Sequence, residues 1–166
     1  MYTGDVMKQI NLKELWKHEA LDFTPWLSKT MIIPDILRSI YHQPFYLYKT
    51  ECPVQSYRLD MLYSSNNGDS VIIENQFGLS DNKHLGQNIV YSSLTKINKV
   101  LWICEDVSLE HRYISKEFSN IDIIPVSFHL YKEGNDYLLR VHVYSNINNC
   151  FVYKINNNLE IENISN

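Results

Sequence analysis

The sequence predicts an α/β protein in which helices flank a mixed sheet that continues into an antiparallel meander. Two apolar runs, residues 57–63 and 70–76, enclose an Asn-Gly turn, which is typical of a β-hairpin. The helical pattern of residues 82–96 precedes a short apolar strand, 98–104, and this strand–helix–strand order predicts one parallel pairing. Three further apolar runs, separated by polar turns, predict the meander: 121–131, 137–144 and 150–155.

The first 54 residues are expected to form helices and one strand. Leu12, Leu15 and Trp16 recur at helical spacing, which predicts a helix over residues 11–22. Thr24-Pro25 resembles an N-cap followed by proline at the first helical position, and Pro34 is suited to open another helical turn. The aromatic-rich segment 45–54 then predicts the first strand of the sheet.

The remaining segments complete a single domain. Ser108 is expected to cap a helix that ends at Phe118. The polar tail, 156–166, is expected to fray. We therefore assign residues 1–166 to one domain, with a core over about 10–130 and C-terminal strands over 137–155.

The composition narrows the class of protein. The 166 residues carry a net charge of −4, which argues against strong, salt-driven binding to nucleic acid. Three isolated cysteines show no zinc-ligand spacing and indicate a reduced, cytoplasmic protein. A signal peptide and an apolar run of membrane-spanning length are both lacking, so we expect no membrane contact.

Two carboxylates are predicted to meet across the hairpin. If the turn is symmetric about Asn67, Asp60 lies opposite Glu74 on the neighbouring strand. Opposed carboxylates repel, and a cation between them removes that penalty. Magnesium, manganese and calcium prefer such oxygen ligands. The alternative is a surface hairpin that carries two exposed acids.

These residues resemble the PD-(D/E)XK nuclease superfamily, whose fold is restriction-endonuclease-like with a three-layer core. The similarity extends to a bacterial subfamily of nuclease-like proteins with a Glu-Asn-Gln core, and it covers about residues 10–130. Five short motifs carry it, namely Glu19 to Leu27, Ile73 to Gln76, His84 to Gln87, Trp102-Ile103 and Glu110 to Arg112.

The resemblance implies roles for particular residues. Asp60 and Glu74 would bind Mg²⁺ or Mn²⁺, and Glu19 would support the metal or its water. Gln76 stands where the superfamily usually has lysine, so it can orient a water molecule but has no charge and no useful pKa. A site that has lost catalysis and kept binding is the alternative.

The helix after the hairpin supplies candidate substrate contacts. Gln87 and Tyr91 match a Gln-x-x-x-Tyr motif and share one helix face, beside Glu74. His84 is a candidate for phosphate contact or proton transfer, with packing against the sheet as the alternative. Lys83 is a candidate for contact with a nucleic-acid backbone, or is simply solvated.

The sequence thus leads to two functional hypotheses. The first is a Mg²⁺-dependent deoxyribonuclease that hydrolyses phosphodiesters in DNA, with a homodimer as a plausible assembly. The second is a nuclease-fold module that binds nucleic acid or a protein partner without efficient catalysis. A purely structural interaction protein is a third reading, and under it Asp60 and Glu74 have no functional role.

Overall fold

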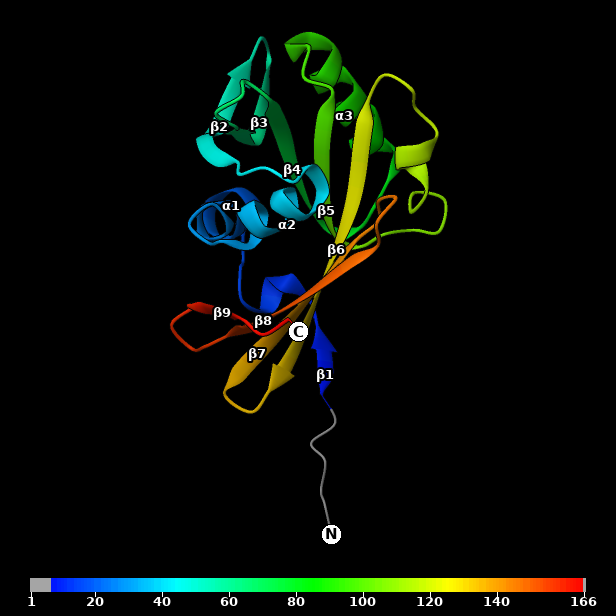
Figure 1. Cartoon of the computed structure of the whole chain (residues 1–166). Coiled ribbons are helices and arrows are strands. Elements are labelled where there is room, and N and C mark those ends of the chain that lie inside the picture. Colours follow the sequence, from blue (N-terminus) through cyan, green and yellow to red (C-terminus); the bar gives the residue numbers. More distant parts are fainter. Residues whose placement is uncertain (1–6, 166) are drawn as a thin grey trace.

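The computed structural model describes residues 7–165 and contains the expected mixed sheet. Its strands are β1 (Lys8–Ile10), β2 (Tyr46–Val54), β3 (Tyr57–Ser64), β4 (Ser70–Leu79), β5 (Lys99–Asp106), β6 (Asp122–Glu133), β7 (Asp136–Val143), β8 (Asn149–Ile155) and β9 (Ile161–Asn163). Within the described residues these nine strands form one sheet in the order β2-β3-β4-β5-β6-β7-β8-β9, and β1 pairs with β6 (Figure 1).

Helices lie on both faces of the sheet, which gives the expected three layers. The helical elements are the short 3₁₀ turn η1 (Leu12–Glu14), the π-helical turn η2 (Glu19–Phe23), α1 (Thr24–Leu27), α2 (Ile32–Tyr41), α3 (Asn82–Thr95) and the 3₁₀ turn η3 (Ile114–Lys116). One apolar cluster joins η2, α1 and α2 to the sheet. A second, smaller cluster lies under α3 and is centred on Trp102 and Tyr91.

The direction of the strands changes in the middle of the sheet. β2, β3 and β4 pair as antiparallel hairpins, whereas β4 with β5 and β5 with β6 are both parallel. The sequence predicted one parallel pairing, and the structure has two. The second parallel pairing arises because residues 107–121 return the chain to the end of the sheet at which β5 starts. Lys99 of β5 therefore pairs with Asp122 of β6.

The expected helices at 11–22 and 108–118 are wrong. The first segment is broken into η1 and η2, because the backbone amide of Leu12 donates to Glu105 and the amide of His18 donates to Asp22. The second contains only turns and η3. There the Ser108 amide donates to the Ser80 hydroxyl, and side-chain bonds of this kind compete with a helical backbone.

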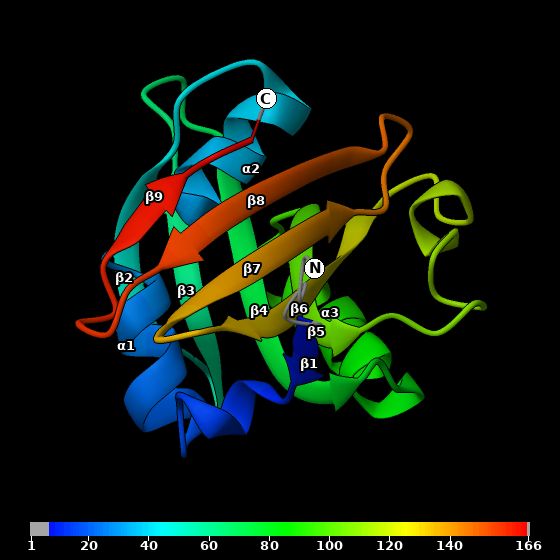
Figure 2. The same ribbon diagram turned by 90° about the horizontal axis from the view of Figure 1, so that it is seen from below.

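The C-terminal meander of β6, β7 and β8 is confirmed, and Figure 2 shows these strands side by side. The expected fraying of the tail is wrong for its described part. Residues Ile161–Asn163 form β9 on the edge of β8, and the indole of Trp26 donates to the carbonyl of Leu159 at 2.8 Å. Across residues 7–165, helices of a length and hydropathy suited to crossing a membrane are lacking.

Candidate metal centre

The site is built where β3 and β4 separate. Their register runs from Ser64 opposite Ser70 to Met61 opposite Ile73, as a turn symmetric about Asn67 requires. The next pair in this register is Asp60 and Glu74, but the backbone ladder ends before it. Instead, the Asn75 amide donates to Oδ2 of Asp60 at 2.7 Å. Where the two strands diverge, the Asp60 carboxylate therefore accepts the hydrogen bond that a backbone carbonyl of β3 would otherwise accept.

Glu19 binds the same edge of β4, where the strand no longer pairs with β3. The π-helical turn η2 places its Oε2 2.7 Å from the amide nitrogen of Phe77, which donates to it. This amide is two residues beyond the one bonded to Asp60, so both bonds are made by one edge of the strand. Glu19 and Asp60 thus come together through the backbone of β4, although they are far apart in the sequence.

Glu74 lies under α3 and is only 4 % exposed. Its Oε1 accepts a hydrogen bond from Nε2 of Gln87 at 3.0 Å. Gln87 also contacts the hydroxyl of Tyr91, and that hydroxyl donates to the carbonyl of Arg58 at 3.1 Å. The structure therefore brings Gln87 and Tyr91 beside Glu74, on the helix face that their spacing predicted.

The second oxygen of Glu74 has no partner. Oε2 is buried and makes no hydrogen bond within the described residues. Burying an unpaired carboxylate oxygen is unfavourable unless a proton, a water molecule or a cation satisfies it. Oε2 of Glu74 is therefore available to a proton, a water molecule or a cation.

Glu51 is a fourth acidic residue near the site, and it was not predicted from the sequence. The β2–β3 register pairs Thr50 with Met61 and Cys52 with Leu59, which places Glu51 opposite Asp60. Its backbone is left-handed, with φ of 48°, and its Oε1 is buried without a partner. The two-residue turn Gln55-Ser56 sets this register, but it lacks the glycine typical of such turns, so the sequence carried no clear signal for it.

Burial dominates the electrostatics of these acids. It raises the pKa of Asp60 and of Glu74 well above the usual carboxyl range, and the neighbouring charges of Glu19 and Glu51 raise both further. Asp60 itself adds to the increase in the pKa of Glu74. The pKa of Glu19 is raised for the same first reason, burial. At neutral pH a nearby positive charge is therefore needed to keep Asp60 and Glu74 both ionised.

The donor set fits a metal that uses few protein ligands. Within residues 7–165, groups of three or more His, Cys, Asp or Glu side chains placed to hold a metal ion are absent. Mg²⁺ commonly binds through one or two carboxylates and keeps several water molecules. Asp60 with Glu74, whose Oε2 lacks a partner, matches that requirement better than a cage of protein ligands would.

Gln76 is held in a closed set of hydrogen bonds. Its Nε2 donates to the carbonyl of Leu79 at 2.6 Å and to Oδ2 of Asp81 at 2.9 Å. Its Oε1 accepts from the indole of Trp102 at 3.1 Å. Both amide hydrogens are thus used. In this arrangement Gln76 fixes the loop between β4 and α3, and it can donate to a water molecule or a phosphate only by giving up one of these bonds.

The other two predicted contacts lie at the start of α3. His84 is half-buried, and its ring nitrogen Nδ1 lies 3.0 Å from Oδ1 of Asp81, the residue that caps the helix. Lys83 is exposed beside it. The structure therefore engages His84 in the helix cap and leaves Lys83 at the surface.

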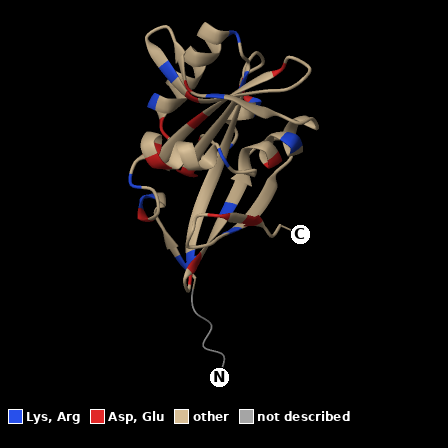
Figure 3. Ribbon diagram, turned by 90° about the vertical axis from the view of Figure 1, so that its left-hand side faces the viewer, with Lys and Arg blue, Asp and Glu red and all other residues tan. Residues whose placement is uncertain are grey.

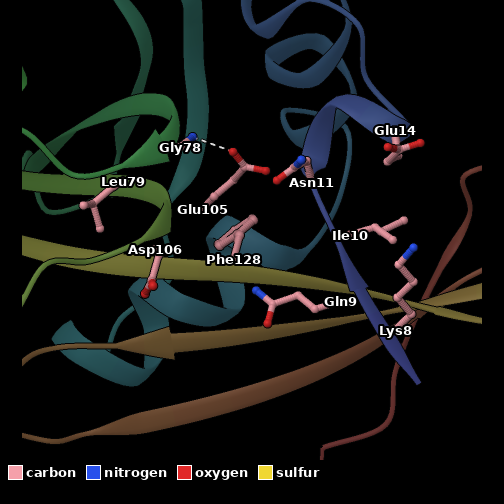
Figure 4. A pocket seen from close by; sticks show the side chains of 10 residues that line it. All are labelled: Lys8, Gln9, Ile10, Asn11, Glu14, Gly78, Leu79, Glu105, Asp106 and Phe128. Carbon is pink, nitrogen blue, oxygen red and sulfur yellow. Dashed lines mark hydrogen bonds between the residues drawn. The ribbon is translucent and has the colours of Figure 1, made fainter. Parts of the chain in front are cut away.

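A hollow of about 500 Å³ opens at the ends of β4 and β5 (Figure 4). One wall is Glu105, whose carboxylate accepts hydrogen bonds from the amides of Gly78 and Leu12, each at 2.5 Å. The residues predicted from the sequence to form the site do not line it. Both oxygens of Glu105 are thus used in hydrogen bonds to the backbone.

Comparisons with known proteins give two weak structural similarities. Neither a family model nor a curated protein matches the chain. A repair endonuclease from Pyrococcus abyssi is similar over 55 % of this chain at 11 % identity, with a TM-score of 0.43. SfsA from Pyrococcus furiosus, solved with Ca²⁺, is similar over 66 % of this chain at 12 % identity, with a TM-score of 0.42. This chain spans 43 % and 62 % of their respective lengths.

Proposed function

We propose that the protein is a Mg²⁺- or Mn²⁺-dependent nuclease that hydrolyses phosphodiester bonds in DNA. The observation that carries the proposal is the pair of half-buried Asp60 and buried Glu74 at the divergence of β3 and β4, in which Oε2 of Glu74 lacks a partner. The motifs described in the sequence support the same chemistry.

The proposal gives each residue a distinct task. Asp60 and Glu74 would hold the metal, which when bound neutralises charge on a phosphate and lowers the pKa of a water molecule. Gln87 orients Glu74 through its hydrogen bond, and Tyr91 positions Gln87 against the backbone of β3. Glu19 uses one oxygen to bind the Phe77 amide, which leaves its second oxygen able to accept from a water molecule.

A second candidate function is a nuclease-like module that binds nucleic acid or a protein partner without efficient catalysis. The closed hydrogen bonds of Gln76 favour it, because no cation then stands in the position that lysine occupies in the superfamily. Lys and Arg residues are also scattered along the ribbon rather than gathered on one element (Figure 3). Both candidates use the same fold and differ in whether bonds are broken.

The deciding experiment is an incubation of the full chain with linear duplex, circular single-stranded and plasmid DNA. Each substrate is treated with Mg²⁺, with Mn²⁺ or with EDTA. We expect products only with metal, and cleavage of the circular substrate would identify endonuclease action. If every substrate stays intact under all three conditions, the nuclease proposal fails and the binding module is the better account.

A further inference from the structure

A second cavity, of about 230 Å³, lies between the segment around η3 and the end of β7. Its volume falls below the roughly 300–1,000 Å³ of ordinary small-molecule pockets. It is therefore suited to one unit of a longer ligand. The lining residues are Arg112, Tyr113, Lys116, His142, Val143, Tyr144, Ser145 and Asn148.

Arg112 and Lys116 make the cavity basic. Arg112, Lys116 and His142 take part in none of the ion pairs found among residues 7–165. His142 adds no charge at neutral pH, because partial burial lowers its pKa and the neighbours His129, Arg112 and Arg140 lower it further. In a chain of net charge −4, this is a local region of positive potential that attracts an anion.

Aromatic rings accompany the cations. The guanidinium of Arg112 lies 5.4 Å from the ring centre of Tyr144, and the ring of His142 stacks on Tyr144 at 6.2 Å. Tyr113 is 62 % exposed, with Nζ of Lys116 at 5.7 Å from its ring centre. Cations beside open aromatic faces are the combination that binds single-stranded nucleic acid, because phosphates meet the charge and bases stack on the rings.

The sheet places this cavity on the same face as the candidate metal centre. Gln76 pairs with Cys104, Cys104 with Ser127, and Ser127 with His142, so all four side chains point to one side. Three strand spacings separate Gln76 from His142, a distance of about 14 Å.

A chain of contacts also links the two places. Trp102 pairs with Glu74, and the ring of His111 packs on Trp102 with 5.1 Å between centres. His111 directly precedes Arg112 and bonds through Nε2 to Asn82 at 3.0 Å, at the start of α3. These contacts connect the segment that carries Arg112 to the start of α3, the helix that covers Glu74.

We propose that this cavity binds one nucleotide unit of a single-stranded nucleic acid, with its phosphate held by Arg112 and Lys116 and its base stacked on Tyr113. This inference rests on the proposed function for the choice of nucleic acid as the ligand. A nucleic-acid strand bound in the cavity would lie on the sheet face that carries Asp60 and Glu74. Binding itself requires neither the metal nor hydrolysis.

The test measures binding of a fluorescent single-stranded oligonucleotide to the full chain by anisotropy, in EDTA and over a range of salt concentrations. We expect Lys116→Glu to weaken binding at least about 5-fold and to reduce the salt slope by about 0.7. Tyr113→Leu should weaken binding about 5-fold or more without changing the slope, because stacking involves no counterion. Both side chains are exposed, so both variants are expected to fold.

Matched controls separate this site from general charge effects. Lys132→Glu makes the same charge change at an exposed residue near the end of β6. Tyr48→Leu removes a tyrosine on β2 that is 70 % exposed. Both should bind like the wild type. Equal losses in the controls and the cavity variants, or no binding by the wild type at low salt, would overturn the proposal.

Two further measurements identify the ligand and distinguish binding in this cavity from the proposed nuclease activity. Inorganic phosphate and a mononucleotide should compete much more weakly than the unlabelled oligonucleotide, and equal competition by the mononucleotide would refute a strand site. The wild type should keep its oligonucleotide affinity in EDTA, because the cavity contacts need no metal ion. A protein that binds through this cavity but never cleaves would sustain this inference while contradicting the proposed nuclease.

Discussion

Glu74→Gln is expected to lower the rate of metal-dependent DNA cleavage by at least about 100-fold. Loss of a residue that only supports a metal ligand typically costs 10- to 100-fold, so loss of a ligand should reach at least the upper end. The substitution keeps the shape of the side chain, and an amide oxygen can still accept from Gln87. The measurement is the initial rate of cleavage at saturating Mn²⁺.

The control for this experiment is Glu133→Gln, which removes the same charge from an exposed residue at the end of β6. It should cleave at the wild-type rate. Circular dichroism and urea unfolding establish that both variants are folded. Cleavage by Glu74→Gln within about 3-fold of the wild-type rate would exclude Glu74 as a metal ligand.

The metal-free protein is expected to become less stable as the pH rises from about 5 to 9. Burial and the neighbouring acids raise the folded-state pKa of Asp60 and Glu74 above the unfolded value near 4. A carboxyl group shifted in this direction favours the folded state most below its unfolded pKa, and the contribution is lost as the pH approaches the folded pKa. The free energy of unfolding should therefore fall over this range.

Glu74→Gln isolates the effect, because its amide does not ionise. In EDTA at pH 8.5 the variant should exceed the wild type in free energy of unfolding by about 1–2 kcal/mol, since one pKa unit corresponds to about 1.4 kcal/mol. At pH 5 the difference should be much smaller. Urea unfolding at both pH values measures it, and the same difference at pH 5 and pH 8.5 would count against a buried, repelling pair.

Local patterns were enough to predict how Asp60, Glu74, Gln87 and Tyr91 are arranged. The Asn-Gly turn set the register that brings Asp60 towards Glu74, and helical spacing placed Gln87 with Tyr91 on the face beside Glu74. Both inferences depend on contacts within one hairpin and one helix. Such short-range geometry follows from strand and helix periodicity alone.

Contacts between distant segments could not be predicted in the same way. Glu19 reaches the edge of β4 through a π-helical turn that replaced part of an expected helix. Gln76 is bonded to Trp102 and to the loop that ends at Asp81, so its amide is not free as its motif suggested. The positions of Glu19 and Gln76 depend on which backbone groups lack a partner in the sheet. The tertiary structure decides which groups those are.

Direct Mn²⁺ binding is the simplest test of whether Asp60 and Glu74 form a divalent-metal site. Isothermal titration calorimetry of the full chain should show one Mn²⁺ per chain for the wild type and for Glu133→Gln. Affinity should fall at least 10-fold in Asp60→Asn and in Glu74→Gln. Absence of Mn²⁺ binding by the wild type, or equal affinity in all four proteins, would show that Asp60 and Glu74 do not form a metal site.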